Sequence, residues 1–326
     1  MRKILCILLA FQLLLPCLAG CGRGEEEQEV SRLTVVATTY PVYLLACTVT
    51  DGVEGVSVER LNTGSVSCLH DYTLSVEDMK KLEGADVIAL NGAGLEDFME
   101  DALAASQAVS IDCSAGVELL ENLSHAHEEG DEDGHDHGHW DPHIWMDPGN
   151  AAIMVENLME GLVQADPDWR ETYLDNAAEA QLSLQTWDSM ARSILDSLEQ
   201  EGVTVGGEPF SVPGLVTFHD GFQYFARAYG FPLLAAIEEE AGSEASAREI
   251  VEITELVKEY DLPVIFTEVN GSDATAQAIA RETGCAVAQL TMVMDGPDGQ
   301  LSNYCDGLMA NLRAIVNGFA GEEVIQ

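Results

Sequence analysis

Histidines are the residues of this 326-residue chain whose types and spacing best suit chemistry. Six of the eight lie close together and are interleaved with aspartates and glutamates: His125, His127, His135, His137, His139 and His143. Neutral imidazoles and carboxylates are good ligands for divalent first-row metals, and histidine-rich tracts are typical of metal binding. The tract therefore predicts metal binding. The alternative, a solvated acidic loop with incidental histidines, is disfavoured because histidine is otherwise almost absent.

The tract has two parts of different composition. Residues 125–139 are acidic and contain glycines, which disfavours a packed core, so we predict a mobile auxiliary loop that collects metal. His143 instead lies in the rigid, apolar segment WDPHIWMDP, which indicates folded structure. Of the two remaining histidines, His70 follows a predicted strand and its turn, and His219 lies at the end of another predicted strand. Because ligands of parallel sheets lie at the carboxyl ends of strands, we predict that these three histidines bind one metal; a purely structural role for each is the alternative.

The beginning of the chain predicts export. Residues 1–20 have a basic start and an apolar run, 4–15, which is shorter than the ~20 residues of a comfortable membrane span and is typical of a signal peptide. The segment LAGC at 18–21 resembles the lipobox of bacterial lipoproteins, in which the cysteine carries lipid. Residues 21–32 are polar, as expected for a flexible tether. We expect anchoring through Cys21, with a plain secretory signal as the alternative.

The net charge and the cysteine pattern argue against nucleic-acid binding and against cysteine-based function. The net charge of −43 argues against a nucleic-acid partner, which would require a basic surface. Five cysteines lie beyond the signal peptide and the lipobox-like segment: Cys47, Cys68, Cys113, Cys285 and Cys305. An odd number cannot all pair, and the lack of a CxxC motif disfavours a thiolate zinc site and a thioredoxin-like function. Cys68, two residues before His70, is a candidate neighbour of the metal; a buried thiol or a partner for Cys113 are the alternatives.

Strands alternate with helices along the chain, which predicts parallel βαβ units and an α/β fold. The predicted strands lie in the segments 33–40, 55–64, 85–94, 108–114, 214–222, 231–238, 262–269 and 285–292. Between the two groups of strands, residues 168–200 place apolar side chains three or four positions apart without Gly or Pro. This spacing predicts an amphipathic helix of roughly 50 Å, which we interpret as a strut between two lobes, with a coiled-coil dimer as the alternative.

These features predict a domain organisation in five parts. A signal peptide (1–20) and a lipidated tether (21–32) precede an N-terminal α/β lobe (33–165) that includes the loop 125–139. A linking helix (166–200) then leads to a C-terminal α/β lobe (201–326). Each lobe is expected to hold a small parallel sheet flanked by helices.

Six segments, in order over nearly the whole mature chain, resemble the zinc- and manganese-type substrate-binding lipoproteins of bacterial ABC importers, the ZnuA/TroA-like family. They are YPVY at 40–43, LHDYTLS at 69–75, ADVIALNGAGLEDFM at 85–99, HWDPHIWMDP at 139–148, TFHDGFQYFARAYG at 217–230 and VIFTE at 264–268. The resemblance implies two α/β lobes joined by a rigid helix, with the metal in the cleft between the lobes and His70, His143 and His219 as its ligands. Manganese-type members usually have glutamate at the third position, so imidazole there favours Zn²⁺ over the harder Mn²⁺.

The fourth ligand departs from the family pattern. Some zinc-type members carry glutamate immediately before the first histidine, where this chain has Leu69. Many relatives carry an aspartate where this chain has Val293, and Asp295 instead directly precedes Gly296. Asp295 and water are therefore both candidates for the fourth position. Glu268 is predicted to contact one of the histidine ligands and fix its orientation without binding the metal itself.

The resemblance implies a non-enzymatic, monomeric receptor anchored by lipid on Cys21 to the outer face of a bacterial cell membrane. Such a receptor delivers Zn²⁺ to an ABC permease and its ATPase. A manganese- or iron-type receptor of the same family is the alternative, with Mn²⁺ as cargo. An exported zinc hydrolase would also suit three protein ligands and water, but the chain has no HExxH motif. A surface adhesin has no independent support in the sequence.

Overall fold

The computed structural model describes residues 32–62, 72–122, 139–200, 202–205, 207–238, 245–269 and 271–325. The predictions for the signal peptide, Cys21, Cys68, His70 and the loop as far as residue 138 fall outside this part of the chain. Ser31–Gln326 forms one compact unit by its backbone contacts. The boundaries of the two lobes therefore stay a prediction.

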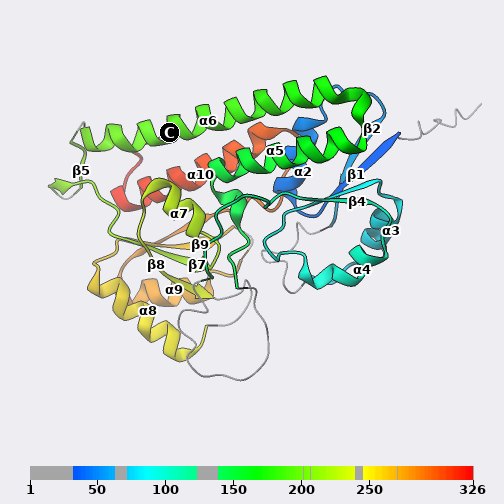
Figure 1. Cartoon of the computed structure of the whole chain (residues 1–326). Helices are drawn as coiled ribbons and strands as arrows, with labels where there is room; N and C mark the ends of the chain where they lie inside the picture. Colours follow the sequence, from blue (N-terminus) through cyan, green and yellow to red (C-terminus); the bar gives the residue numbers. More distant parts are fainter. Residues whose placement is uncertain are drawn as a thin grey trace, which may run out of the picture. The chain divides into compact units, whose positions relative to one another are not determined.

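The first half of the chain builds one parallel sheet (Figure 1). Its strand order is β2-β1-β3-β4, with the strands at Leu33–Ala37 (β1), Val56–Arg60 (β2), Val87–Leu90 (β3) and Val109–Asp112 (β4). Val35 and Val36 are both fully buried although they point to opposite faces, so both faces of the sheet are covered. Helix α2 (Tyr40–Val49) covers one face, and α3 (Val76–Gly84) contacts the other, where Leu82, Val36 and Ile88 pack together. A 3-10 turn, η2 (Asp97–Met99), and α4 (Glu100–Ala105) follow β3.

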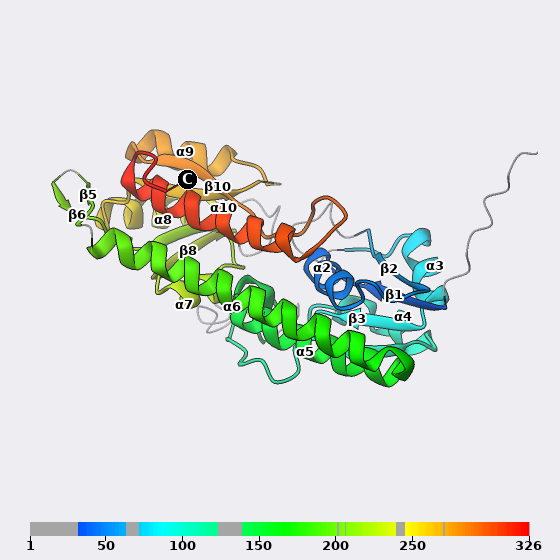
Figure 2. The same cartoon turned by 90° about the horizontal axis from the view of Figure 1, so that it is seen from above.

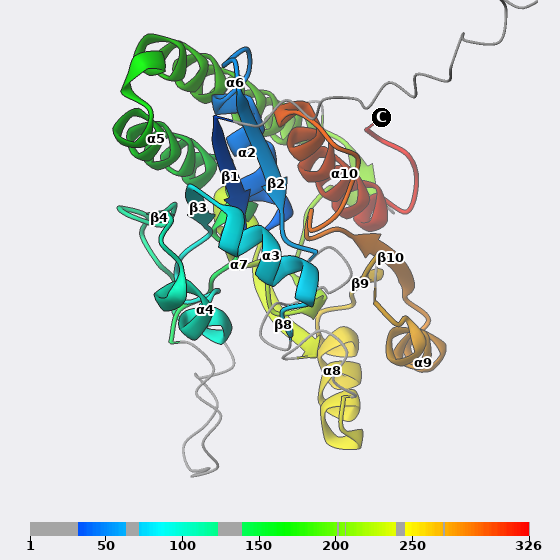
Figure 3. The ribbon, with the colours of Figure 1, turned by 90° about the vertical axis from the view of Figure 1, so that its right-hand side faces the viewer.

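The second half contains two parallel strand pairs. Strands β7 (Leu215–His219) and β8 (Leu233–Glu238) form one pair, and β9 (Val264–Glu268) and β10 (Ala286–Leu290) form the other. β7 lies beside β9, so the two pairs are neighbours. Helices α9 (Ala274–Thr283) and α10 (Leu301–Ala320) pack on the second pair from opposite sides (Figure 3). Helices α7 (Gln223–Tyr229) and α8 (Ala247–Glu259) and a short ribbon, β5 (Thr204–Val205) with β6 (Glu208–Pro209), complete this half.

The helices begin where local sequence signals place them. Ser75 and Ser246 form capping boxes at the beginnings of α3 and α8. In each box the serine hydroxyl accepts from the backbone nitrogen of the third helical residue, and the side chain of that residue accepts from the serine backbone nitrogen. Pro41 lies in the first turn of α2, with Thr39 as its N-cap. Asp147 caps α5 (Pro148–Ala165) by accepting a hydrogen bond from Gly149 N, at 2.7 Å.

The predicted long helix is present. A 3-10 turn, η5 (Pro167–Trp169), leads into α6 (Arg170–Gln200), whose 31 residues span about 47 Å at ~1.5 Å per residue. α6 packs along α5 and contacts α2 from the first half and α10 from the second (Figures 1 and 2). At its beginning Asp166 accepts hydrogen bonds from Arg32 and from the hydroxyl of Tyr173, and the Arg32 guanidinium lowers the pKa of this carboxyl. The α/β fold with parallel sheets and a long helix is thus confirmed.

Among the helices of the described residues, none combines the length and the apolar character that crossing a membrane requires.

Candidate metal centre

The structure describes one of the three predicted histidine ligands in full. His143 lies between β4 and α5, directly before the 3-10 turn η4 (Ile144–Met146), and only 3% of its surface is exposed. His219 is the last residue of β7, at the carboxyl end where it was predicted, and its side chain is outside the description. Within the described residues no three His, Cys, Asp or Glu side chains form a group that could hold a metal. The three-histidine site therefore stays a prediction.

Asp141 fixes the orientation of His143. Its Oδ1 accepts one hydrogen bond from the backbone nitrogen of His143, at 2.9 Å, and lies 2.7 Å from the ring nitrogen Nδ1. Because an ionised carboxylate can only accept, Nδ1 donates to Asp141, and a metal bound by this ring would be bound through Nε2. Metal-binding histidines are commonly held in this way by a carboxylate. Asp141 was missed by the sequence reasoning, although its spacing of two residues from His143 is a local signal.

Two buried side chains hold the backbone around His143 in place. Asn91, which follows β3, donates from Nδ2 to the carbonyl oxygen of Pro142 at 2.9 Å. Tyr224 of α7 donates its hydroxyl hydrogen to the carbonyl oxygen of Asp141 at 2.9 Å, and the Tyr224 hydroxyl oxygen accepts from Leu120 N at 3.0 Å. Both Asn91 and Tyr224 are fully buried. The segment is therefore fixed by contacts from both halves of the chain.

Glu96 supports Asn91 from behind. Its Oε1 accepts from the Thr38 hydroxyl and from Asn91 N, at 2.5 and 2.7 Å, and its Oε2 accepts from Gly92 N at 3.0 Å. Burial raises the pKa of this carboxyl to about 7, although the hydrogen bonds oppose the shift. Gly92 has φ +83°, and a Cβ there would lie 2.0 Å from Asp112 Oδ1, so only glycine fits this turn.

The loop after β10 reaches back to the first half of the chain. Trp145 Nε1 donates to the carbonyl oxygen of Met292 at 2.8 Å, and the Tyr40 hydroxyl donates to the carbonyl oxygen of Pro297 at 2.7 Å. The Tyr304 hydroxyl in α10 donates to the carbonyl oxygen of Trp145. These bonds bring the loop 291–297 next to the segment that carries His143.

Val293 and Asp295 differ in what they offer to this site. Val293 has φ +57°, is 3% exposed and packs against Gly307 of α10, so its side chain belongs to the core. Asp295 is about half exposed, and its Oδ1 lies 3.1 Å from Arg60 Nη2 at the end of β2. The Asp295 carboxylate, which is the candidate fourth ligand, is therefore paired with Arg60 in this structure.

Glu268 ends a strand that lies beside β7. It is the last residue of β9, it is 4% exposed, and β9 lies beside β7, which ends at His219. Asp220, directly after His219, is also buried. This placement suits the predicted role of Glu268 in orienting a histidine, which stays a prediction.

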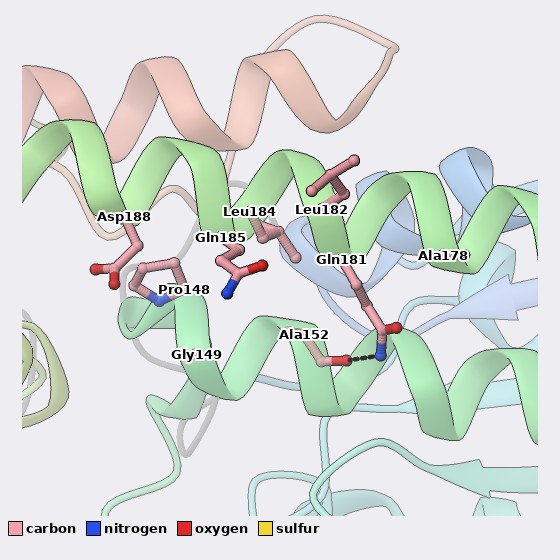
Figure 4. Close-up of a pocket in the computed structure, with 9 residues that line it drawn as sticks. All are labelled: Pro148, Gly149, Ala152, Ala178, Gln181, Leu182, Leu184, Gln185 and Asp188. Carbon is pink, nitrogen blue, oxygen red and sulfur yellow. Dashed lines mark hydrogen bonds between the residues drawn. The ribbon is translucent and has the colours of Figure 1, made fainter.

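A hollow between α5 and α6 is not a candidate metal site (Figure 4). Its volume is about 490 Å³, and most of its lining is apolar or amide. Gln181 in this lining donates from Nε2 to the carbonyl oxygen of Ala152 at 3.0 Å. Asp188 is the single titratable residue among those that line it. One carboxylate cannot supply the four ligands that zinc takes.

Comparisons with known proteins identify a matching family and similar curated proteins. The model of a family described as "Zinc-uptake complex component A periplasmic" (ZnuA) matches residues 35–318. The "Zinc-binding lipoprotein AdcA" of Streptococcus pneumoniae (strain ATCC BAA-255 / R6) is 28% identical over 307 residues, which are 91% of this chain and 58% of the relative. The chain thus spans about half the length of the curated AdcA relatives it matches, between 50% and 58%.

Two solved structures share the fold. A crystal structure of ZnuA has a TM-score of 0.71 and 26% identity, and the match covers 88% of this chain and 98% of that one. A mutant of the laminin-binding adhesin Lmb from Streptococcus agalactiae has a TM-score of 0.70 and 25% identity, with 88% and 99% covered.

Proposed function

Because the chain belongs to the ZnuA family of periplasmic zinc-uptake components, we propose that it is an extracytoplasmic receptor that binds Zn²⁺ and delivers it to an ABC permease and its ATPase. The observation that carries this proposal is the buried His143 ring, whose Nδ1 is engaged by Asp141, 2.7 Å away. The names of the AdcA and ZnuA relatives support zinc as the cargo. The family is that of an uptake component, and we propose that the chain performs no catalysis.

We propose that His70 and His219 join His143 as zinc ligands. Three neutral imidazoles at ~2.0–2.1 Å would supply most of a tetrahedral site, with Asp295 or water in the fourth position. The placement of His219 at the carboxyl end of β7 supports this arrangement. Handover to a permease requires that the bound ion can be removed, so the affinity is high and the site can still open.

Zinc titration of the purified chain tests the proposal. Competition with a chromophoric chelator should show one tightly held Zn²⁺, and alanine at His70, His143 or His219 should each weaken it by orders of magnitude with little effect on thermal unfolding of the metal-free chain. His139→Ala is the control, because this ring is exposed and lies 3.8 Å from Glu121. Near-native affinity in two of the three ligand variants would refute the site.

The same titration decides between zinc and manganese. Imidazole ligands favour Zn²⁺ over Mn²⁺, so Zn²⁺ should displace bound Mn²⁺ at near-stoichiometric concentrations. The metal content of the protein purified from its native host, measured by mass spectrometry, identifies the physiological ion. Preferential retention of Mn²⁺ would make the manganese-type receptor the correct assignment.

We also propose that Cys21 carries lipid and anchors a monomeric receptor to the outer face of the cell membrane. The lipobox-like segment at 18–21 supports this, as does the printed name of the S. pneumoniae relative, a lipoprotein. A tagged fatty acid should label the native protein and leave Cys21→Ser unlabelled. Equal labelling of both proteins would contradict the assignment.

A further inference from the structure

Arg60 occupies an unusual position for an arginine in a cation receptor. It ends β2, and its Nη2 lies 3.1 Å from Asp295 Oδ1 and 3.5 Å from the carbonyl oxygen of Gly296. The guanidinium lies over the rings of Tyr40 and Tyr43, with its carbon 4.8 and 5.7 Å from their centroids. Two aromatic faces and a carboxylate therefore fix the cation in one place.

A contribution to folding stability does not explain the position of Arg60. Nη1 of Arg60 is buried and has no hydrogen-bond partner among the described residues, so part of the desolvation cost of the guanidinium is not recovered. The partner carboxylate of Asp295 is half exposed, and ion pairs of this kind contribute little to folding. A role in binding explains the position better than a role in folding.

The loop that carries Asp295 is held on both sides of that residue. Met292 and Pro297 accept hydrogen bonds from Trp145 and Tyr40. A Cβ at Gly296 would lie 2.4 Å from the Tyr40 hydroxyl oxygen, so the loop backbone lies directly on this ring. With the backbone held, the freedom that remains to Asp295 is mainly rotation of its side chain, either towards Arg60 or away from it.

We infer that Arg60 is a built-in competitor of Zn²⁺ for the Asp295 carboxylate. This inference rests on the proposed function and assigns Asp295 as the fourth ligand. In the metal-free receptor Arg60 holds the carboxylate, and zinc must displace it to complete its coordination. When zinc leaves, Arg60 takes the carboxylate back, which favours release to the permease. The arginine thus lowers the affinity of the site to a level that permits delivery.

The size of the effect follows from the strength of the pair. A half-exposed arginine–carboxylate pair of this kind contributes at most about a fivefold factor, because solvent screens it. Removal of Arg60 should therefore raise zinc affinity about three- to fivefold. Because release is what the pair assists, most of this change should appear in the dissociation rate, measured by transfer of zinc to a chelator in stopped flow.

A double-mutant cycle on the full chain tests the inference. Arg60→Gln should tighten zinc binding and slow zinc release, and Asp295→Asn should weaken binding. In the Asp295→Asn background, Arg60→Gln should change affinity less than about twofold, because the shared carboxylate is gone. Arg192→Gln is the matched control: it removes the same charge from another pair, with Asp188 at 2.9 Å and the Tyr229 ring at 5.5 Å, and should leave zinc binding unchanged.

Two outcomes of the double-mutant cycle would contradict the competition between Arg60 and Zn²⁺. Unchanged or weaker zinc binding in Arg60→Gln, with native thermal unfolding, would overturn the inference. An equal gain with and without Asp295 would also overturn it, because the effect would then be general charge repulsion. If Arg60→Gln does not fold, Arg60→Lys serves: it keeps the charge but loses the planar fork, and should still tighten binding by a smaller factor. Failure of the proposed function is separate, because the unmodified chain would then hold no tight Zn²⁺.

Discussion

Asp141→Asn is the substitution that most directly tests whether Asp141 orients the His143 ring for zinc binding. The amide has nearly the same shape as the carboxylate, so the packing of a side chain that is 1% exposed is preserved. The change removes the charge that accepts from both His143 N and Nδ1, at 2.9 and 2.7 Å. It also places an amide group where Oδ2 is now buried without a hydrogen-bond partner among the described residues.

Two estimates of the cost agree. Hydrogen bonds to a charged group are worth ~1.5–3 kcal/mol, against ~0.5–1.5 for neutral ones, so about 1–2 kcal/mol of orientation energy is lost. Loss of a carboxylate that orients a metal-binding histidine typically weakens metal affinity ~10–100-fold, which is about 1.4–2.8 kcal/mol. We therefore expect Asp141→Asn to weaken zinc binding by one to two orders of magnitude, less than His143→Ala.

Chelator competition at neutral pH measures the affinity, and thermal unfolding of the metal-free chain verifies the fold. Asp188→Asn is the control, since it removes the same charge from an aspartate paired with Arg192 on the far side of α5 from the sheet. It should leave zinc affinity within about twofold. If Asp141→Asn also stays within about twofold while His143→Ala abolishes tight binding, the histidine does not depend on Asp141 and the reasoning is refuted.

Three further predictions concern pH and the histidine-rich loop. Because burial raises the folded-state pKa of Glu96 to about 7, the folded chain retains a proton that the unfolded chain releases above pH ~4.5, and the free energy of unfolding falls as pH rises across this window. Glu96→Gln should remove up to ~3 kcal/mol of this pH dependence in urea unfolding of the metal-free chain; equal slopes in both proteins would contradict the shift. Zinc retention should fall steeply from pH ~7 to ~5, because protons compete for imidazoles of reference pKa ~6.5; constant affinity would exclude a three-histidine site. Deleting residues 125–139 should lower the number of weakly bound zinc ions counted by equilibrium dialysis and keep the tight one; loss of the tight ion in a folded protein would make the loop the receptor site.

Much of the fold could be predicted because its signals are local. Strand β9, for example, is an apolar run bounded by turn residues, and the capping boxes at Ser75 and Ser246 mark the beginnings of helices within four residues. The ribbon β5–β6 was not predicted, because two-residue strands carry no periodicity. The long helix begins at Arg170, after a 3-10 turn that Pro167 starts, and not at residue 168.

The environment of the site was less predictable because its contacts are not local. His143 stands out by residue type and motif, but the bond from Asn91 to Pro142 and the pair of Arg60 with Asp295 join segments that share no sequence signal. The packing of the sheets determines which loops lie next to one another. Only the spacing of Asp141 and His143 offered a local clue to how the His143 ring is oriented.

The hydrogen bonds of the loop 291–297 also bear on when the site can form during folding. They join residues that are 257 positions apart for Tyr40 with Pro297 and 147 apart for Trp145 with Met292. Closing such long loops costs chain entropy before any contact repays it, so contacts of this separation form slowly. A chain truncated before α10 would keep every predicted ligand and still lack the Tyr304 bond to Trp145. We therefore expect the segment that carries His143 to reach its final geometry only after the last helix has been synthesised and docked.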